Sequence, residues 1–208
     1  GGSFTRADGS PADYLAVWDG TDWQPLPVEV NGTVDALCVF QGQLIAGGAF
    51  SAAGGTVLNC IGAWDGTSWS PLGIGVAVDT PEVYALAVWN DVLAVGGRFW
   101  EAGGQSVNNL AQWDGSAWAP ISSGADGTVW AFVVHDSTLV FAGAFGWAGG
   151  VATGISSWNG QTWNTFNGGM DNAVDGIGLY NGKLVAAGPF GRAGGVEAHS
   201  AAEWNGIT

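Results

Sequence analysis

The stretch GGAFSAAGGTVLNCIGAWDGTSWSPLG, residues 47–73, carries the pattern that decides the fold. Its skeleton is GGxF, then AGG, then WDGxxW, and versions of this skeleton recur along the whole chain. The first Trp of WDGxxW and its counterparts are spaced 45 to 49 residues apart, at Trp18, Trp64, Trp113, Trp158 and Trp204. A repeat of this length with about four strands in each unit is typical of a β-propeller.

The composition indicates the same fold class. The 208 residues include 37 glycines, and Asp-Gly or Asn-Gly pairs follow most of the repeat tryptophans. Such pairs are typical of tight turns between short strands, and no segment has a sustained helical periodicity. We therefore expect an all-β protein, one propeller domain over residues 1–208 with about eighteen strands. It has five blades of about 46 residues and four strands each, or is a piece of a larger propeller.

The units run approximately over 1–33, 34–82, 83–128, 129–173 and 174–208, and the first and last are incomplete. In the second unit we expect strands over 34–40, 44–50, 59–64 and 69–72. Asp65-Gly66 predicts a two-residue hairpin turn, which pairs Trp64 with Thr67 and places Gly62 opposite Trp69. The same count places a small residue opposite the later Trp of three other units, at Ala16, Ala111 and Ser156.

The nine tryptophans at the two repeat positions have two readings. As exposed residues they would form sugar-stacking platforms. As buried residues they would fill the space between blades, each removing about 150–250 Å² from water. We favour the buried reading, because so much apolar surface is costly to expose nine times.

The two cysteines do not predict a disulfide. Cys38 and Cys60 fall in the first and third strands of one unit, roughly 9–10 Å apart across two strand spacings. A disulfide needs Cα atoms within about 7 Å. We expect two free thiols.

The charge excludes two classes of partner. Eighteen acidic and four basic residues give a net charge of −14, which repels phosphate backbones and anionic lipid headgroups. We expect no nucleic-acid partner, and no membrane insertion, because no apolar run is long enough to cross a bilayer. The field suits cations such as Ca²⁺, although acidity also keeps a Trp-rich surface soluble.

The repeat resembles a known family. A Gly-Gly doublet that closes the second strand, an aromatic in the third (Trp64) and a later Trp (Trp69) resemble kelch-type propeller repeats. The fuller pattern, which ends in Pro-Leu-Gly, is similar to repeats of the fungal cortical cell-polarity marker family and of secreted bacterial propeller proteins. The resemblance implies a propeller fold and an extracellular or cell-surface location. It transfers no activity, because kelch-like propellers include both enzymes and binding proteins.

Some repeats depart from the pattern. Asp8 stands in place of a Gly of AGG, and Ala142 and Ala187 stand in place of the first Gly of the doublet. We expect the fourth and fifth units to pack somewhat differently from the others.

Two positions between the repeat Phe and AGG vary while everything around them is constant. They read Thr5-Arg6, Ser51-Ala52, Trp100-Glu101, Gly146-Trp147 and Gly191-Arg192. They lie at the start of the connection from the second to the third strand, which shares an edge with the connections between units. Variable loops on a rigid scaffold commonly carry binding sites, and drift at exposed positions is the alternative. The candidate ligand-binding residues are Trp100, Glu101, Trp147, Arg192 and Arg6.

Three polar residues in the connections between units are weaker candidates for a metal site. Asn31, Asp126 and Asp171 each stand three residues before the first Val of the next unit. Oxygen ligands that converge near a channel could hold Ca²⁺, but Asp and Asn are also ordinary turn residues, and no known ligand spacing is present. We expect no other cofactor.

These patterns predict a non-catalytic extracellular or cell-surface scaffold that binds a protein or a glycan through this edge. Neither His135 nor His199 has a Ser, Cys or metal-ligand partner at a motif spacing, so we assign no catalytic residue. One alternative is a carbohydrate-active enzyme at the channel mouth, where distant acids can meet. Another is a self-assembling unit whose incomplete end blades pair between chains.

Overall fold

The computed structural model describes residues 1–78, 80–150 and 152–205. These residues contain strands and no helix, and the named strands pair antiparallel. The described part of the chain thus has no helical segment that could span a membrane. The predicted all-β class is confirmed.

Each of the three central units forms one four-stranded sheet. The second unit has the order β5 (Thr33–Phe40), β6 (Gln43–Ala49), β9 (Ile61–Trp64), β10 (Trp69–Pro71). The third consists of β12 (Glu82–Trp89), β13 (Val92–Arg98), β16 (Leu110–Trp113) and β17 (Trp118–Pro120). The fourth consists of β18 (Thr128–His135), β19 (Thr138–Ala144), β20 (Ile155–Trp158) and β21 (Trp163–Asn164).

The two end units have smaller sheets. The first unit pairs β3 (Ala16–Trp18) with β4 (Trp23–Pro25), which correspond to β9 and β10 of the second unit. The last unit has β22 (Gly176–Tyr180), β23 (Lys183–Ala187) and β26 (Ala201–Glu203), which correspond to β5, β6 and β9. Within the described residues, therefore, the last unit has no counterpart of β10.

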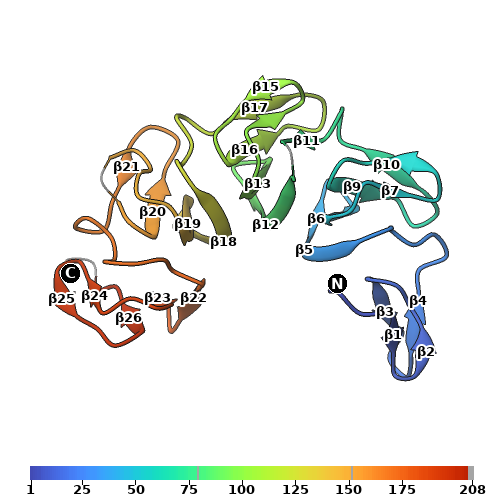
Figure 1. The fold of residues 1–208 in the computed structure, drawn as a ribbon, viewed down its shortest axis with the longest axis horizontal. Coiled ribbons are helices and arrows are strands. Elements are labelled where there is room, and N and C mark those ends of the chain that lie inside the picture. The colour runs from blue at the N-terminus through green and yellow to red at the C-terminus, as the bar shows by residue number, and fades with distance from the viewer. Residues whose placement is uncertain (79, 151, 206–208) are drawn as a thin grey trace.

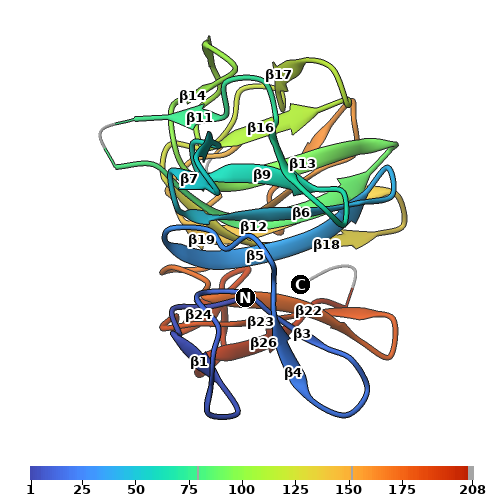
Figure 2. The ribbon, with the colours of Figure 1, turned by 90° about the vertical axis from the view of Figure 1, so that its right-hand side faces the viewer.

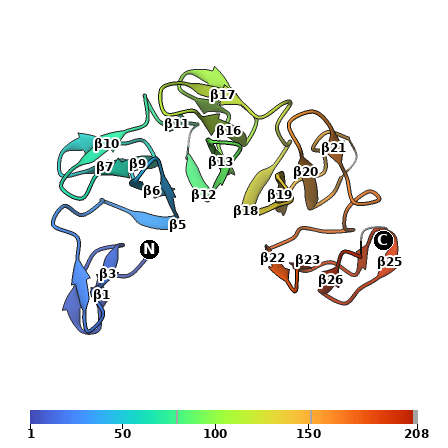
Figure 3. The ribbon, with the colours of Figure 1, turned by 180° about the vertical axis from the view of Figure 1, so that it is seen from behind.

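The sheets stand side by side around an arc (Figure 1). The first strand of each sheet lies toward the inside of the arc, and β5 contacts β12, β12 contacts β18, and β18 contacts β22. The view from behind shows the first and last units at the two ends of the arc, with a gap between them (Figure 3). The apolar core is divided accordingly into clusters, most of which combine residues of two neighbouring units.

The AGG segments form small hairpins that the repeat pattern did not predict. These are β1 (Arg6–Ala7) with β2 (Ser10–Pro11), β7 (Ala52–Ala53) with β8 (Thr56–Val57), β14 (Glu101–Ala102) with β15 (Gln105–Ser106), and β24 (Arg192–Ala193) with β25 (Val196–Glu197). Together with β11 (Val76–Ala77), they bring the described residues to 26 strands. Figure 2 shows β1, β7, β14 and β24 on the same side of the arc.

Positive backbone angles explain why these hairpins turn at glycine. Gly54 and Gly55 have φ of 54° and 87°, as a two-residue type I′ turn requires. Asp8 has φ of 47° and takes the first place of the same turn in the first unit. Asp tolerates this conformation better than most residues, so its departure from AGG preserves the turn.

The two-residue turn predicted at Asp65-Gly66 is wrong. Trp64 pairs with Trp69 rather than with Thr67, and Gly62 pairs with Pro71. The loop has four residues, because Asp65 Oδ1 accepts hydrogen bonds from the backbone N–H groups of Thr67 (2.7 Å) and Ser68 (2.8 Å). These bonds hold the pKa of the exposed Asp65 carboxyl well below its usual range.

The same correction applies to the other units. The two repeat tryptophans pair directly in the first, third and fourth units, Trp18 with Trp23, Trp113 with Trp118 and Trp158 with Trp163. Ala16 and Ala111 are opposite prolines, and Ser156 is not opposite Trp163. Each Trp pair therefore makes a tilted ring contact, with centroids 5.0–5.6 Å apart.

The second glycine of the GGxF doublet allows a close backbone approach. A Cβ atom on Gly143 would lie 2.1 Å from the Thr128 carbonyl oxygen, beside a β-bulge between β18 and β19. Gly48 and Gly97 have the same constraint. The first glycine faces a side chain of the next unit instead, as Gly96 faces Phe132. A side chain can move aside, so the alanine at position 142 is tolerated.

The later Trp of the second and third units packs against the preceding unit. Trp69 and Trp118 are buried, and their indole Nε1–H groups donate to the backbone carbonyls of Val28 (2.8 Å) and Leu72 (2.7 Å) in the preceding units. Trp18 and Trp23 of the first unit are 51% and 44% exposed. The buried reading thus holds for Trp64, Trp69 and Trp118 and is wrong for the first unit. The remaining repeat tryptophans are half-buried, namely Trp113, Trp158, Trp163 and Trp204.

Both cysteines are free, as expected. Cys38 lies in β5, and Cys60 lies one residue before β9. Burial raises the pKa of the Cys60 thiol to about 11, so this thiol is neutral and weakly nucleophilic near neutral pH.

Candidate functional site

The connections between units meet the loops that follow β6, β13, β19 and β23, as the sequence predicted. In the second unit, Asn31 Oδ1 accepts hydrogen bonds from the backbone N–H groups of Ser51 (2.9 Å) and Ala52 (3.0 Å). The Asn31 Nδ2 group donates to Ser51 Oγ at 2.9 Å. A single side chain therefore holds the two variable positions of this loop in place.

Two aspartates make the same contact in later units. Asp126 Oδ1 accepts from the backbone N–H groups of Gly146 (2.8 Å) and Trp147 (2.9 Å). Asp171 Oδ1 accepts from those of Gly191 (2.8 Å) and Arg192 (3.0 Å). The Arg192 amide bond is the main cause of the lowered pKa of Asp171. In each loop, two successive backbone N–H groups donate to one side-chain oxygen, which fixes the conformation of the loop.

These contacts give the three metal-site candidates a structural role. Each of them binds the loop of the following unit rather than a shared centre. No group of three or more His, Cys, Asp or Glu side chains in the described ranges is placed to hold a metal ion. A Ca²⁺ site at this edge therefore stays a prediction, and no cluster of metal-ligating side chains in the described residues supports it.

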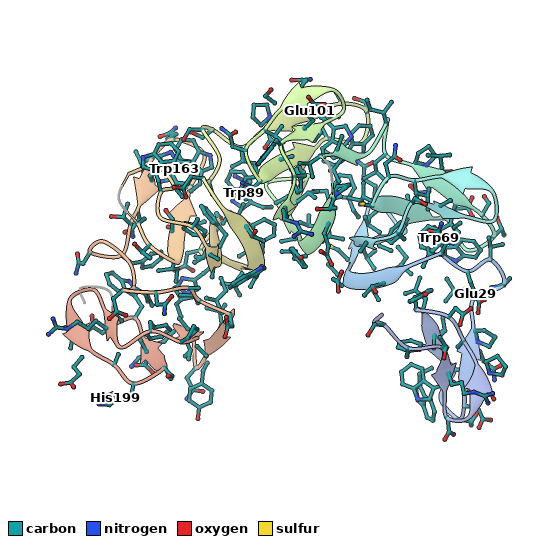
Figure 4. All side chains as sticks on the ribbon, in the orientation of Figure 1. Glu29, Trp69, Trp89, Glu101, Trp163 and His199 are labelled. Carbon is teal, nitrogen blue, oxygen red and sulfur yellow. The ribbon has the colours of Figure 1, made fainter. Side chains whose placement is uncertain are left out.

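The five candidate binding residues are on the surface of this edge. Trp100 is 62% exposed and Trp147 is 39% exposed, and Glu101, Arg192 and Arg6 are exposed as well. Glu101 begins β14 in the third unit (Figure 4). The five residues come from four different units, so the fold places them on one edge of the arc but not in one cluster.

A hollow of about 440 Å³ opens at this edge, between the loop after β6 and the connection that leads from the second unit to β12. Asn31, Phe50 and Ser51 line it on one side, and Ala77 and Pro81 on the other. The volume is within the range of small-ligand sites.

Trp100 and Glu101 lie beside this hollow, because both contact Ala77, one of the residues that line it. Glu101 pairs with Ala77 in the β11–β14 ladder, and the Trp100 N–H donates to the Ala77 carbonyl at 3.3 Å. The exposed side chains of Trp100 and Glu101 therefore lie next to Ala77, a residue that lines the hollow. This arrangement offers a stacking surface, a hydrogen-bond acceptor and a cavity together.

Sequence reasoning missed the hollow because segments far apart in the sequence, from Asn31 to Pro81, come together to form it. One signal was present, since Trp64 and Trp113 are 49 residues apart while the other spacings are 45 or 46. The extra residues lie in the connection that leads to β12, which forms one wall of the hollow.

A polar cluster at the start of β12 was also missed. Glu82 accepts a hydrogen bond from the Tyr84 hydroxyl and forms an ion pair with Arg98 at 3.3 Å. Burial and the Glu82 charge raise the pKa of Asp35 on β5, and burial is the main cause of the Tyr84 pKa of about 12. Glu82 directly follows Pro81, which lines the hollow, and its charge acts on Asp35, so two carboxylates lie close to each other beside this lining residue.

No family model and no curated protein matches the sequence. Among solved structures, the chain is similar to a computationally designed protein, Ika8, with 15% identity and a TM-score of 0.44. The match covers 77% of this chain and 44% of that protein. The chain therefore spans less than half the length of this designed protein.

Proposed function

We propose that this chain is a kelch-like β-propeller, or part of one, that acts as a non-catalytic extracellular or cell-surface scaffold. Its partner is a glycan or another protein, bound at the edge that carries Trp100 and Trp147. Two observations support the propeller fold. The sequence pattern repeats about every 46 residues, and the sheets stand around an arc with the first strand of each sheet on the inside of the arc. The resemblance to secreted and cell-surface families supports the location.

The observation that carries the proposal is the exposure of Trp100 beside the hollow. At 62% exposure, its indole stays in water although the repeat does not require a Trp at this position. Large aromatic side chains contribute strongly to recognition because they bring much apolar area with little conformational entropy to lose. A rigid loop lowers that entropy cost further.

Two libraries of candidate ligands test the proposal. A glycan array tests the glycan, and a phage-displayed peptide library tests the protein. We expect at least one of them to yield a ligand whose binding is saturable. Failure of both libraries would contradict the proposed binding role.

A second candidate is a carbohydrate-active enzyme at the same edge. The observation that favours it is the carboxylate pair near the hollow, with the pKa of Asp35 raised by burial and by Glu82. A carboxyl group with a raised pKa next to a second carboxylate suits general acid–base chemistry. Glycans that bind on the array are incubated with the protein and analysed for products. Release of product that Asp35→Asn abolishes would favour the enzyme over the scaffold.

A further inference from the structure

The polar side chains that line the hollow are already bonded within the fold. Asn31 Oδ1 accepts from two backbone N–H groups, and Asn31 Nδ2 donates to Ser51 Oγ. Asn59 Nδ2 donates to a backbone carbonyl at 2.8 Å, and the Cys60 thiol donates to the Pro81 carbonyl at 3.3 Å. The other lining residues are apolar. Sugar hydroxyls that leave water need hydrogen-bond partners, so this lining suits an apolar side chain better than a glycan.

Two exposed apolar side chains flank the hollow. Trp100 is 62% exposed, and its N–H donates to the carbonyl of the lining residue Ala77. Ile74 is 65% exposed, and its carbonyl accepts the bond from Asn59 of the lining. The Ile74 Cδ1 atom would lie 3.7 Å from a Cβ atom on Gly104, in the turn between β14 and β15. Exposed apolar side chains around a hollow are typical of a protein-interaction site.

The charge beside the hollow is negative. Glu101 is exposed and pairs with Ala77 in the β11–β14 ladder, and no Lys, Arg or His of the described residues forms an ion pair with it. Glu82, which follows the lining residue Pro81, forms its ion pair with Arg98. The whole chain has a net charge of −14. A basic partner is therefore attracted to this edge, and an acidic one is repelled.

We propose that the hollow binds a segment of a separate protein that presents one bulky apolar side chain and, close to it in sequence, a Lys or Arg. The apolar side chain enters the hollow beside Trp100, and the basic group lies against Glu101. This inference rests on the proposed function, because it names the kind of partner that the same edge binds. The apolar contact supplies most of the affinity, whereas the exposed ion pair adds little affinity and accelerates association.

The phage-displayed library of random peptides tests the chemistry of the partner. We expect the enriched peptides to share a bulky apolar residue with a Lys or Arg near it. A fluorescein-labelled copy of the most enriched peptide is then titrated by fluorescence anisotropy. Ala in place of its apolar residue should weaken binding at least tenfold, and a rise in salt from about 0.05 to about 0.5 M should weaken it several-fold. Enriched peptides that lack these two features, or a labelled peptide that is insensitive to both changes, would overturn the proposal.

Substitutions beside the hollow locate the site. Ala77→Leu places a larger side chain in its wall, and we expect at least tenfold weaker peptide binding. Ala144→Leu is the matched control, because Ala144 is exposed on β19 of the fourth unit and does not line the hollow. Glu101→Gln keeps the size of the side chain and should weaken binding about two- to fivefold and reduce its salt dependence.

Thermal melting shows whether each variant is folded, and the comparison of the two labelled peptides uses the wild-type chain alone. Unchanged peptide binding by folded Ala77→Leu would place the peptide elsewhere and overturn the proposal.

The two libraries separate this inference from the proposed function. A glycan that binds saturably while no peptide is enriched would overturn the inference and leave the binding role in place. Failure of both libraries would overturn both. A basic, apolar peptide that loses affinity in Ala77→Leu but not in Ala144→Leu would support both.

Discussion

The indole Nε1–H of Trp118 donates a hydrogen bond of 2.7 Å to the backbone carbonyl of Leu72, and both residues are buried. This bond joins the fourth strand of the third unit to the end of the fourth strand of the second. Trp69 makes the corresponding bond to Val28. The units are thus linked by a repeated contact that combines a buried aromatic ring with a satisfied carbonyl.

Replacing Trp118 should destabilise the chain in two separable steps. Trp118→Phe keeps most of the ring but leaves the Leu72 carbonyl without its donor, at a cost of about 1–3 kcal/mol. Trp118→Ala also opens a cavity, at a cost of about 3–5 kcal/mol. Urea denaturation monitored by circular dichroism measures both. The control is Trp23→Ala at the equivalent, 44% exposed position, which should cost under about 1 kcal/mol. Equal losses at the two positions would refute the linking role.

The two glycines of the doublet should respond differently to alanine. Gly143→Ala drives a Cβ to within 2.1 Å of the Thr128 carbonyl oxygen, and the backbone cannot yield without breaking the β18–β19 ladder. We expect a loss of about 2–3 kcal/mol. Gly96→Ala meets the ring of Phe132 at 2.7 Å, which can move aside, so the loss should be smaller. Denaturation midpoints rank the variants, and the reverse order would contradict the proposed backbone approach.

The aspartates of the four-residue loops should contribute to acid stability. Hydrogen bonds from the loop hold the pKa values of Asp19, Asp65 and Asp114 below the ordinary value of 3.8. Because the folded pKa is the lower one, their stabilisation is fully present above about pH 4 and is lost as the pH falls through the folded values. Asn159 makes equivalent bonds in the fourth unit, so Asn at the three positions should preserve the loops.

We therefore expect the triple Asp→Asn variant to lose less stability than the wild type when acidified from about pH 5 to about pH 2. Urea midpoints across this range give the two curves. Parallel curves would show that the pKa values of these three carboxyl groups do not differ between the folded and the unfolded chain.

Much of the fold could be predicted from the repeat. The central strands lie within about two residues of their predicted bounds, because the hydrophobic runs and the Gly doublet are local signals. The register between the third and fourth strands could not be predicted from the sequence. Asp65-Gly66 is compatible with both a two-residue turn and a four-residue loop, and the choice depends on the amides of Thr67 and Ser68, which close on the carboxylate.

The candidate site was only partly predictable. The exposure of Trp100 and Trp147 and their shared edge followed from the variable positions, but Asn31, Asp126 and Asp171 clamp loops where the sequence suggests a metal site. The sequence shows that a polar residue is present without showing which amide it faces. The hollow depends on how the connection that leads to β12 packs against the loop after β6, which the repeat pattern does not contain.

The central claim is that the edge with Trp100 and Trp147 binds the partner. The direct measurement is a calorimetric titration of the ligand found in the libraries into wild type, Trp100→Ala and Trp147→Ala. Trp18→Ala is the control, because this Trp is 51% exposed but lies in β3 rather than in a loop of that edge. We predict at least tenfold weaker binding for Trp100→Ala, a smaller loss for Trp147→Ala, unchanged binding for Trp18→Ala, and melting temperatures close to wild type for all three. Wild-type affinity in both loop variants would contradict the account.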